Sequence, residues 1–138
     1  MSLFNTLDVA STGLSAQSYR LNVVASNLAN ANSAVSSTGQ PYRAREVVFA
    51  AQPMSGAGVP AGVSGVQVAG VVEKPGPLRM VYEPGNPLAD KQGYVRYPNV
   101  DPVDEMVNMI SASRAYQADV NVMNTARNLL LKTLTLGQ

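Results

Sequence analysis

The stretch "ASNLANANS" (25–33) places three asparagines at the end of an apolar, helix-like pattern. Asparagine is a mediocre helix former because its side-chain amide competes for backbone hydrogen bonds. An amphipathic pattern that runs into such residues indicates either the end of a helix or a place where polar amides meet another element.

The segment before the asparagines has the periodicity of an amphipathic helix. Leucine recurs every seven residues, at Leu7, Leu14, Leu21 and Leu28. A strict seven-residue repeat is typical of a helix whose leucines form the seam with another helix. Gly13 lies inside the repeat and costs about 1 kcal/mol relative to alanine, so this helix is not intrinsically robust.

The last third of the chain predicts a second, longer helix. In "NVDPVDEM" (99–106), Asp101 can cap the helix and Pro102 suits its first position, while Asp104 and Glu105 lie at the positive end of the dipole. About 35 residues from Pro102 would form a rod of about 50 Å. Gly137 lies where a C-cap is expected.

Apolar residues follow this second helix on more than one side. One stripe contains Met106, Met109, Tyr116, Val120, Met123, Leu130 and Leu134, and others outside it include Val103, Val107, Ile110, Val122, Leu129, Leu131 and Leu136. Apolar residues on several sides predict several neighbours. A compact helical bundle with a β insertion is the alternative.

The middle of the chain has a different composition. Eight of the nine prolines lie between 41 and 98, and "SGAGVPAGVSG" (55–65) predicts a flexible loop. Four short runs predict strands or extended segments: 44–50, 66–73, 78–83 and 93–98. We therefore expect a mainly α protein with a small β or extended middle, divided into an N-terminal helix (1–33), a middle segment (34–98) and a C-terminal helix (99–138).

The composition argues against catalysis and metal binding. The chain has no histidine and no cysteine, which removes the commonest general base and the usual transition-metal ligands. The acidic cluster Asp101, Asp104 and Glu105 is better explained by helix capping than by calcium binding. We expect no enzyme activity, no cofactor and no small-molecule substrate.

The charge pattern also limits the partners. Ten basic and nine acidic residues give a net charge of +1, which offers no pull toward nucleic acid. Only 14% of residues are charged, against about 25% in ordinary soluble domains, so part of the surface is expected to be covered. No apolar run approaches the roughly 18 residues of a membrane span, and no cleavable secretory signal is apparent. The chain is not expected to insert into a membrane.

Both ends of the chain resemble the axial rod proteins of the bacterial flagellar basal body. The resemblance lies in "GLSAQSYRLNVVASNLANANS" (13–33) and in nearly all of 93–138. In the middle, "YRAREVVF" (42–49) and "RMVYEPGNPLADKQGYV" (79–95), together with the chain length, are similar to a proximal-rod member. The glycine-rich segment 54–65 is the part of the chain that least resembles the family.

The resemblance implies a structural role. Members of this family pair their terminal helices as a coiled-coil-like hairpin and polymerise, with copies of themselves and other rod proteins, into a helical tube. That tube crosses the periplasm and transmits motor torque. The resemblance further implies transit through the flagellar type III export apparatus without a cleaved signal. Another rod protein, or a free-standing helical adaptor or secretion-chaperone-like module, is the alternative.

The helical repeats and the resemblance together predict the residues of the subunit interface. They are Leu7, Leu14, Leu21, Asn27, Leu28, Asn30, Met106, Met109, Ile110, Tyr116, Val120, Met123, Leu130 and Leu134. Asn27 is expected to fix the register of the subunit contact, because a slipped alignment would leave its amide unpaired. For Asn30 and Asn32, a subunit contact and a simple helix end with left-handed geometry remain equal alternatives.

Overall fold

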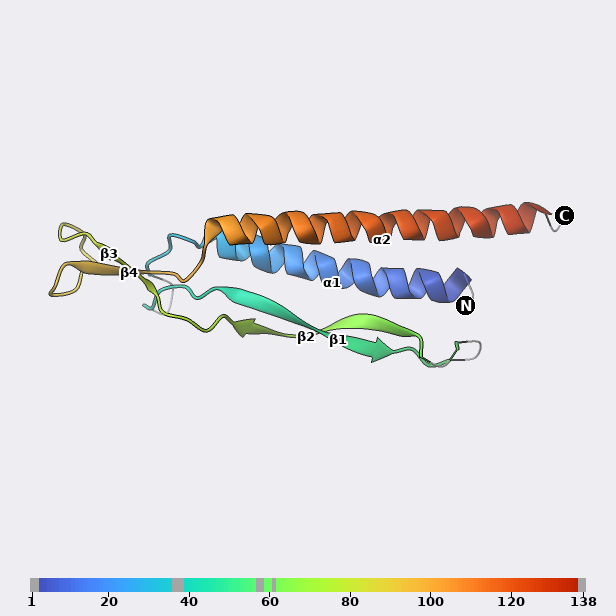
Figure 1. Cartoon of the computed structure of the whole chain (residues 1–138), viewed down its shortest axis with the longest axis horizontal. Helices are drawn as coiled ribbons and strands as arrows, with labels where there is room; N and C mark the ends of the chain where they lie inside the picture. The colour runs from blue at the N-terminus through green and yellow to red at the C-terminus, as the bar shows by residue number, and fades with distance from the viewer. Residues whose placement is uncertain (1–2, 36–38, 57–58, 61, 137–138) are drawn as a thin grey trace.

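The molecule is elongated and built around two antiparallel helices (Figure 1). The computed structural model describes residues 3–35, 39–56, 59–60 and 62–136. Helix α1 (Leu3–Ala29) and helix α2 (Pro102–Leu136) lie side by side with opposite directions. The two predicted long helices are therefore confirmed, while Gly137, the expected C-cap of α2, lies outside the described residues.

The four predicted strand segments form two separate antiparallel ribbons. Strand β1 (Arg45–Pro53) pairs with β2 (Ser64–Glu73), and β3 (Arg79–Tyr82) pairs with β4 (Tyr94–Tyr97). The register of the first ribbon shifts between Val48 and Phe49. The β1–β2 ribbon lies along α1, whereas the β3–β4 ribbon projects beyond the helices (Figure 1).

Thr12 attaches the β1–β2 ribbon to α1. Its Oγ1 donates to the carbonyl of Val9 at 2.7 Å and accepts the N–H of Val66 at 3.1 Å. A Cβ on Gly65 would lie 2.7 Å from the same Oγ1. Gly65 is therefore needed for the strand to approach the helix this closely.

The most buried residues of the two helices include several small ones. Ala16 on α1 and Ala112 and Ala126 on α2 are buried. A Cβ on Gly13 would lie 2.7 Å from Asp119 Oδ2 of α2. The four leucines of the predicted seam are half-buried in the single chain: Leu7, Leu14, Leu21 and Leu28.

Aspartate side chains fix two turns in the chain. Asp101 Oδ1 accepts the N–H of Val103 at 2.8 Å, which confirms the predicted cap of α2. In the loop between β3 and β4, Asp90 Oδ1 accepts the N–H groups of Tyr94 and Gln92, each at 2.9 Å. The hydrogen bond from the Tyr94 N–H is the main reason that the pKa of Asp90 is lowered.

Candidate subunit interface

Asn27 lies at the centre of a junction between α1, β1 and α2. Its side chain is 1% exposed. Its Oδ1 accepts the Tyr42 hydroxyl and the Arg45 N–H, both at 2.9 Å. Its Nδ2 donates to the Arg45 carbonyl at 2.8 Å and to Glu105 Oε2 at 3.1 Å. An amide side chain has two donor hydrogens and two acceptor sites, so all four are in use.

This arrangement gives Asn27 a role within its own chain. The residue is 1% exposed, and its amide is bonded to Tyr42, Arg45 and Glu105. The contact with an adjacent subunit stays a prediction. The register that it sets is internal: it fixes β1 and the beginning of α2 against α1. Glu105, which is 5% exposed, depends on Asn27 for a hydrogen bond to its carboxylate.

The other two asparagines of the opening stretch also bond within the chain. Asn30 Nδ2 donates to the Ser26 carbonyl at 2.9 Å, and its Oδ1 accepts the Ser33 hydroxyl at 3.1 Å. Asn32 Oδ1 accepts Arg79 Nη2 at 3.1 Å. Every positive φ angle in the described chain belongs to a glycine, so left-handed geometry does not explain these asparagines. Asn30 closes the end of α1 through its side chain instead.

Asn99 completes the junction from the other side. Its Oδ1 accepts the Ala44 N–H and its Nδ2 donates to the Lys74 carbonyl, both at 3.0 Å. Beside it, Ala31, Ala44 and Val100 form a small buried cluster. Asn99 is not among the residues predicted from the sequence, although an asparagine just before the second helix mirrors the asparagine near the end of the first.

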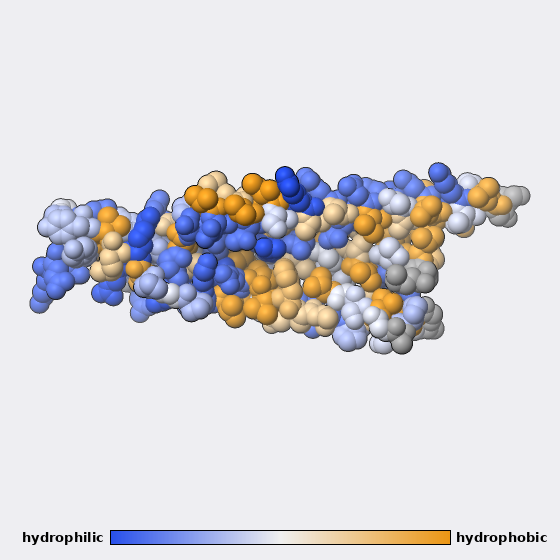
Figure 2. Space-filling view, viewed as in Figure 1, coloured by the Kyte–Doolittle hydropathy of each residue, from blue (hydrophilic) through white to orange (hydrophobic). Residues whose placement is uncertain are grey.

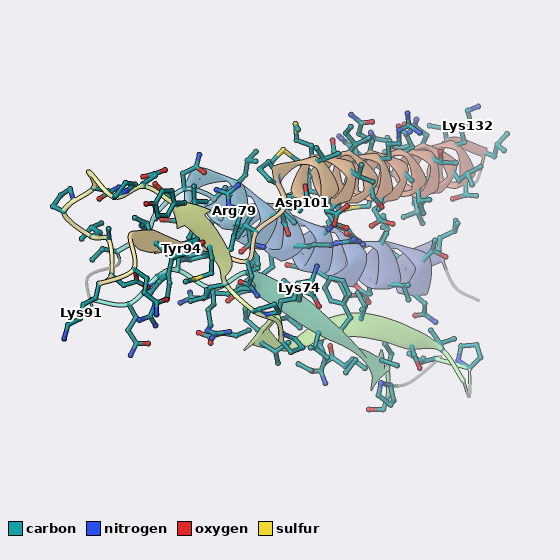
Figure 3. The ribbon with its side chains drawn as sticks, turned by 60° about the vertical axis from the view of Figure 1, so that its left-hand side comes forward. Lys74, Arg79, Lys91, Tyr94, Asp101 and Lys132 are labelled. Atoms are coloured by element: carbon teal, nitrogen blue, oxygen red, sulfur yellow. The ribbon has the colours of Figure 1, made fainter. Side chains whose placement is uncertain are left out.

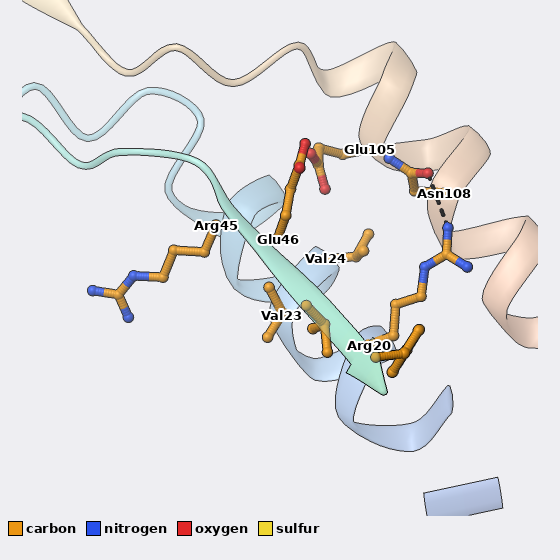
Figure 4. Close-up of a pocket in the computed structure, with 9 residues that line it drawn as sticks. Arg20, Val23, Val24, Arg45, Glu46, Glu105 and Asn108 are labelled. Carbon is orange, nitrogen blue, oxygen red and sulfur yellow. Dashed lines mark hydrogen bonds between the residues drawn. The ribbon is translucent and has the colours of Figure 1, made fainter. Parts of the chain in front are cut away.

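A cleft of about 350 Å³ opens between α1, β1 and α2 (Figure 4). Arg20 Nη2 donates to Asn108 Oδ1 at 3.3 Å across it, and Glu46 and Glu105 extend from opposite walls. Apolar side chains such as Val23 line the rest. Nowhere in the described ranges do three His, Cys, Asp or Glu side chains gather as metal ligands. The cleft therefore offers packing surface and scattered charges and no convergent reactive group.

Helix α2 contrasts with the junction because it buries very little. Of its 35 residues, Glu105, Ala112 and Ala126 are buried. Figure 2 shows hydrophobic residues over the beginning of α2 and again toward its C-terminal end. The large exposed hydrophobic residues of this helix are Val103, Met106, Val107, Ile110, Tyr116, Val122, Leu129, Leu131, Leu134 and Leu136.

The predicted interface residues fall into three groups. Four on α2 are exposed in the single chain: Met106, Ile110, Tyr116 and Leu134. Nine are half-buried: Leu7, Leu14, Leu21, Leu28, Asn30, Met109, Val120, Met123 and Leu130. Asn27 alone is fully buried among its own chain's atoms. The exposed and half-buried groups are the surface available to a neighbour.

Two family models match the ends of the chain. The model described as "Flagella basal body rod protein" matches residues 7–34, which cover most of α1. The model described as "Flagellar basal body rod FlgEFG protein C-terminal" matches residues 91–136, which include β4 and all of α2. The matched segments therefore contain most of α1 and all of α2.

Curated relatives match over their whole length. Proteins named flagellar basal-body rod protein FlgC are 60% identical in Yersinia enterocolitica and 56% identical in Salmonella typhimurium, with all of both chains covered. The protein of that name in Borreliella burgdorferi is 39% identical, with all of this chain and 99% of the relative covered. Within the part of the chain that the structure describes, neither helix is long and apolar enough to cross a membrane.

Proposed function

We infer that this chain enters the flagellar rod by burying the exposed faces of its two helices against neighbouring rod subunits. The chain belongs to the family of flagellar basal-body rod proteins FlgC and is a structural subunit of the proximal rod. The neighbours are copies of this chain and other rod proteins, arranged as a helical tube. The tube carries motor torque across the periplasm.

The exposure of α2 is the observation that carries this proposal. A 35-residue helix with three buried side chains makes too few contacts within one chain to be held along its whole length. Ten large hydrophobic residues remain exposed on it, at both ends and on several sides. Burial of one such leucine contributes about 1.5–3 kcal/mol relative to its exposure, so contact with neighbours is strongly favourable.

The same arrangement suits the transmission of torque. Bending and twisting of a tube are resisted by many parallel contacts between subunits, and long helices with several apolar sides supply them. The low proportion of charged residues, 14%, agrees with surfaces that are packed against neighbours, because unpaired charges are costly to bury.

Transit to the rod would use the flagellar type III export apparatus without cleavage of the chain. Helices that gain most of their burial only in the rod would also remain easy to unfold for export. Mass spectrometry of the subunit recovered from basal bodies tests this part of the proposal, which predicts an uncleaved N-terminus.

Complementation of a flagellated host that lacks its own relative of this chain tests the rod assignment. Leu131→Glu is the informative variant, because Leu131 is 51% exposed in the single chain and its replacement leaves the internal packing intact. We expect loss of motility and absence of the variant from purified basal bodies, with an unchanged circular dichroism spectrum. Gln117→Glu is the matched control, since it adds the same charge at another exposed position of α2 and should leave motility intact.

The opposite outcome would favour the adaptor reading. A Leu131→Glu variant that swims normally, or a wild-type chain that complements motility without being present in basal bodies, would show that the exposed face of α2 serves a single client instead of the rod.

A further inference from the structure

We propose that the free end of α2 of an adjacent rod subunit packs on an apolar patch at the beginning of α2, so that rod subunits join end to end through this one helix. The apolar patch consists of Val103, Met106, Val107 and Ile110, and the free end is residues 129–136. The inference rests on the proposed rod function and specifies which surfaces meet.

The apolar patch is a single, outward helical face. Its members are spaced at i, i+3, i+4 and i+7, which places them on one side of the helix. Their exposed fractions are 63%, 47%, 62% and 55% in chain order. Glu105 and Ala112, which are buried toward the rest of the chain, lie on the other side. Figure 2 shows this patch as a hydrophobic area over the beginning of α2.

The patch is limited to the first part of α2. The same face continues through Arg114, Gln117, Asn121 and Asn128, all polar and exposed. A helix packed along the full length of this face would cover those polar groups, which is unfavourable without partners. The partner therefore has to be short, about as long as the patch itself.

The free end of α2 meets that requirement. Helix α2 has 35 residues and α1 has 27, so α2 is eight residues longer, or about 12 Å at 1.5 Å per residue. It extends past the beginning of α1 (Figure 1). Leu131, Leu134 and Leu136 are 51%, 68% and 86% exposed there. The patch also spans eight residues, so the two surfaces have the same length.

The charges around the two surfaces are complementary. Asp101 and Asp104 adjoin the apolar patch, and Arg127 and Lys132 adjoin or lie in the free end. Figure 3 shows Asp101 and Lys132 at opposite ends of α2. The side chains of Asp104, Arg127 and Lys132 have no hydrogen-bond or ion-pair partner among the residues that the structure describes. These opposite charges favour a contact between the free end of one α2 and the beginning of another α2 over a contact between two like ends.

Two different surfaces at opposite ends of one elongated chain make a heterologous contact. Such a contact does not close on itself and produces an open series of subunits. The partner is accordingly a helix end similar to residues 127–136, which is apolar with basic residues beside it. It belongs to a subunit that carries the C-terminal segment matched over 91–136. The contact is smaller than a self-sufficient interface, so it acts together with the lateral contacts of the rod.

Photo-crosslinking in flagellated cells tests the contact. The full-length chain carrying Val107→benzoylphenylalanine replaces the host's own relative, and the cells are irradiated. Basal bodies are then purified, and the adduct is mapped by peptide mass spectrometry. We expect attachment to the last two turns of the C-terminal helix of an adjacent rod subunit. Asn121→benzoylphenylalanine is the control on the same helical face and should not give that adduct.

Two further variants sharpen the result. Leu134→benzoylphenylalanine should give the reciprocal adduct, attached to the segment that corresponds to 101–110 of an adjacent rod subunit. Adding Asp104→Lys to the Val107 variant should lower the adduct yield, whereas adding Gln117→Lys should not.

The outcomes separate this inference from the proposed function. Motile cells whose Val107 adducts map to any other segment would overturn the end-to-end contact while leaving the rod function intact. Absence of both the wild-type chain and the variant from basal bodies would overturn the rod function, and the inference with it.

Discussion

The junction around Asn27 and the free end of α2 are opposites within one molecule. At the junction, every donor and acceptor of a buried amide is satisfied by the same chain. At the free end, Leu134 and Leu136 are 68% and 86% exposed. The polar groups of the junction are thus buried and satisfied, whereas the free end exposes leucines of the kind that form a protein core.

This difference indicates that the junction and the free end of α2 have different roles. Within the single chain, the junction holds the two helices and the β1–β2 ribbon together through the hydrogen bonds of Asn27. Under the proposed function, the exposed part of α2 is buried only by neighbours in the rod. Variants at the junction should therefore affect the isolated chain, and variants at the free end should affect only the assembled rod.

Asn27→Ala should cause the largest loss of stability in the isolated chain. It would leave the buried Glu105 carboxylate and the Arg45 backbone groups without partners. We expect a decrease of about 2–4 kcal/mol in the free energy of unfolding, measured by urea denaturation. Asn22→Ala, an exposed asparagine on the same helix, is the control and should change stability by less than about 0.5 kcal/mol. Equal effects of the two variants would contradict the role of the junction.

Gly65→Ala should have a smaller effect, at the contact between α1 and the ribbon. The new methyl group would lie 2.7 Å from Thr12 Oγ1, so Thr12 must move and its bond from the Val66 N–H weakens. We expect a loss of about 1–2 kcal/mol. Gly70→Ala in the same strand has open space around it and should not be destabilising. The two unfolding curves, compared by circular dichroism, would coincide if β2 did not depend on this close approach.

Leu134→Ala should leave the isolated chain unchanged within about 0.5 kcal/mol, because this leucine is already exposed. Val24→Ala, which truncates a side chain that is 5% exposed, should cost about 2 kcal/mol. In cells we expect Leu134→Ala to reduce motility although it does not lower the stability of the isolated chain. A clear loss of stability for Leu134→Ala in the dilute chain would show that the free end has a partner within its own chain.

Asp90 offers the smallest and most local test. The hydrogen bonds from the Tyr94 and Gln92 amides lower the pKa of its carboxyl, so the stability that they contribute is present above the usual Asp pKa. That stability is lost only as the pH falls through the lowered value. An NMR titration of the two amides should therefore have its midpoint below that of a free Asp side chain. A midpoint at or above the ordinary value would show that the loop between β3 and β4 is not closed by Asp90.

Local signals predicted the elements well. The cap at Asp101, the proline at the first position of α2 and the β-branched runs each depend on neighbours in sequence, and all four strands and both helices appear where expected. The seven-residue leucine repeat predicts less, since its four leucines are half-buried in the single chain. Helical periodicity shows that one side of a helix is apolar, but it does not show which side approaches its partner most closely.

The junction could not be predicted because it joins residues that are distant in sequence. Asn27, Tyr42, Arg45 and Glu105 come from three elements, and only the fold brings their polar atoms together. Polarity near an apolar seam suggested a bonded amide at Asn27, but sequence alone does not distinguish a partner in the same chain from one in a neighbour. The exposure of α2, in contrast, follows from apolar residues on several sides of one helix.

Hydrogen–deuterium exchange of the dilute chain and of the chain in purified basal bodies tests the central claim most directly. We expect the amides of residues 129–136 to exchange rapidly in the dilute chain and to be strongly protected in the rod, while the amides around Asn27 and Arg45 are protected in both. Strong protection of residues 129–136 in the dilute chain would contradict the account, because it would mean that the free end of α2 is stabilised by its own chain and not by its neighbours.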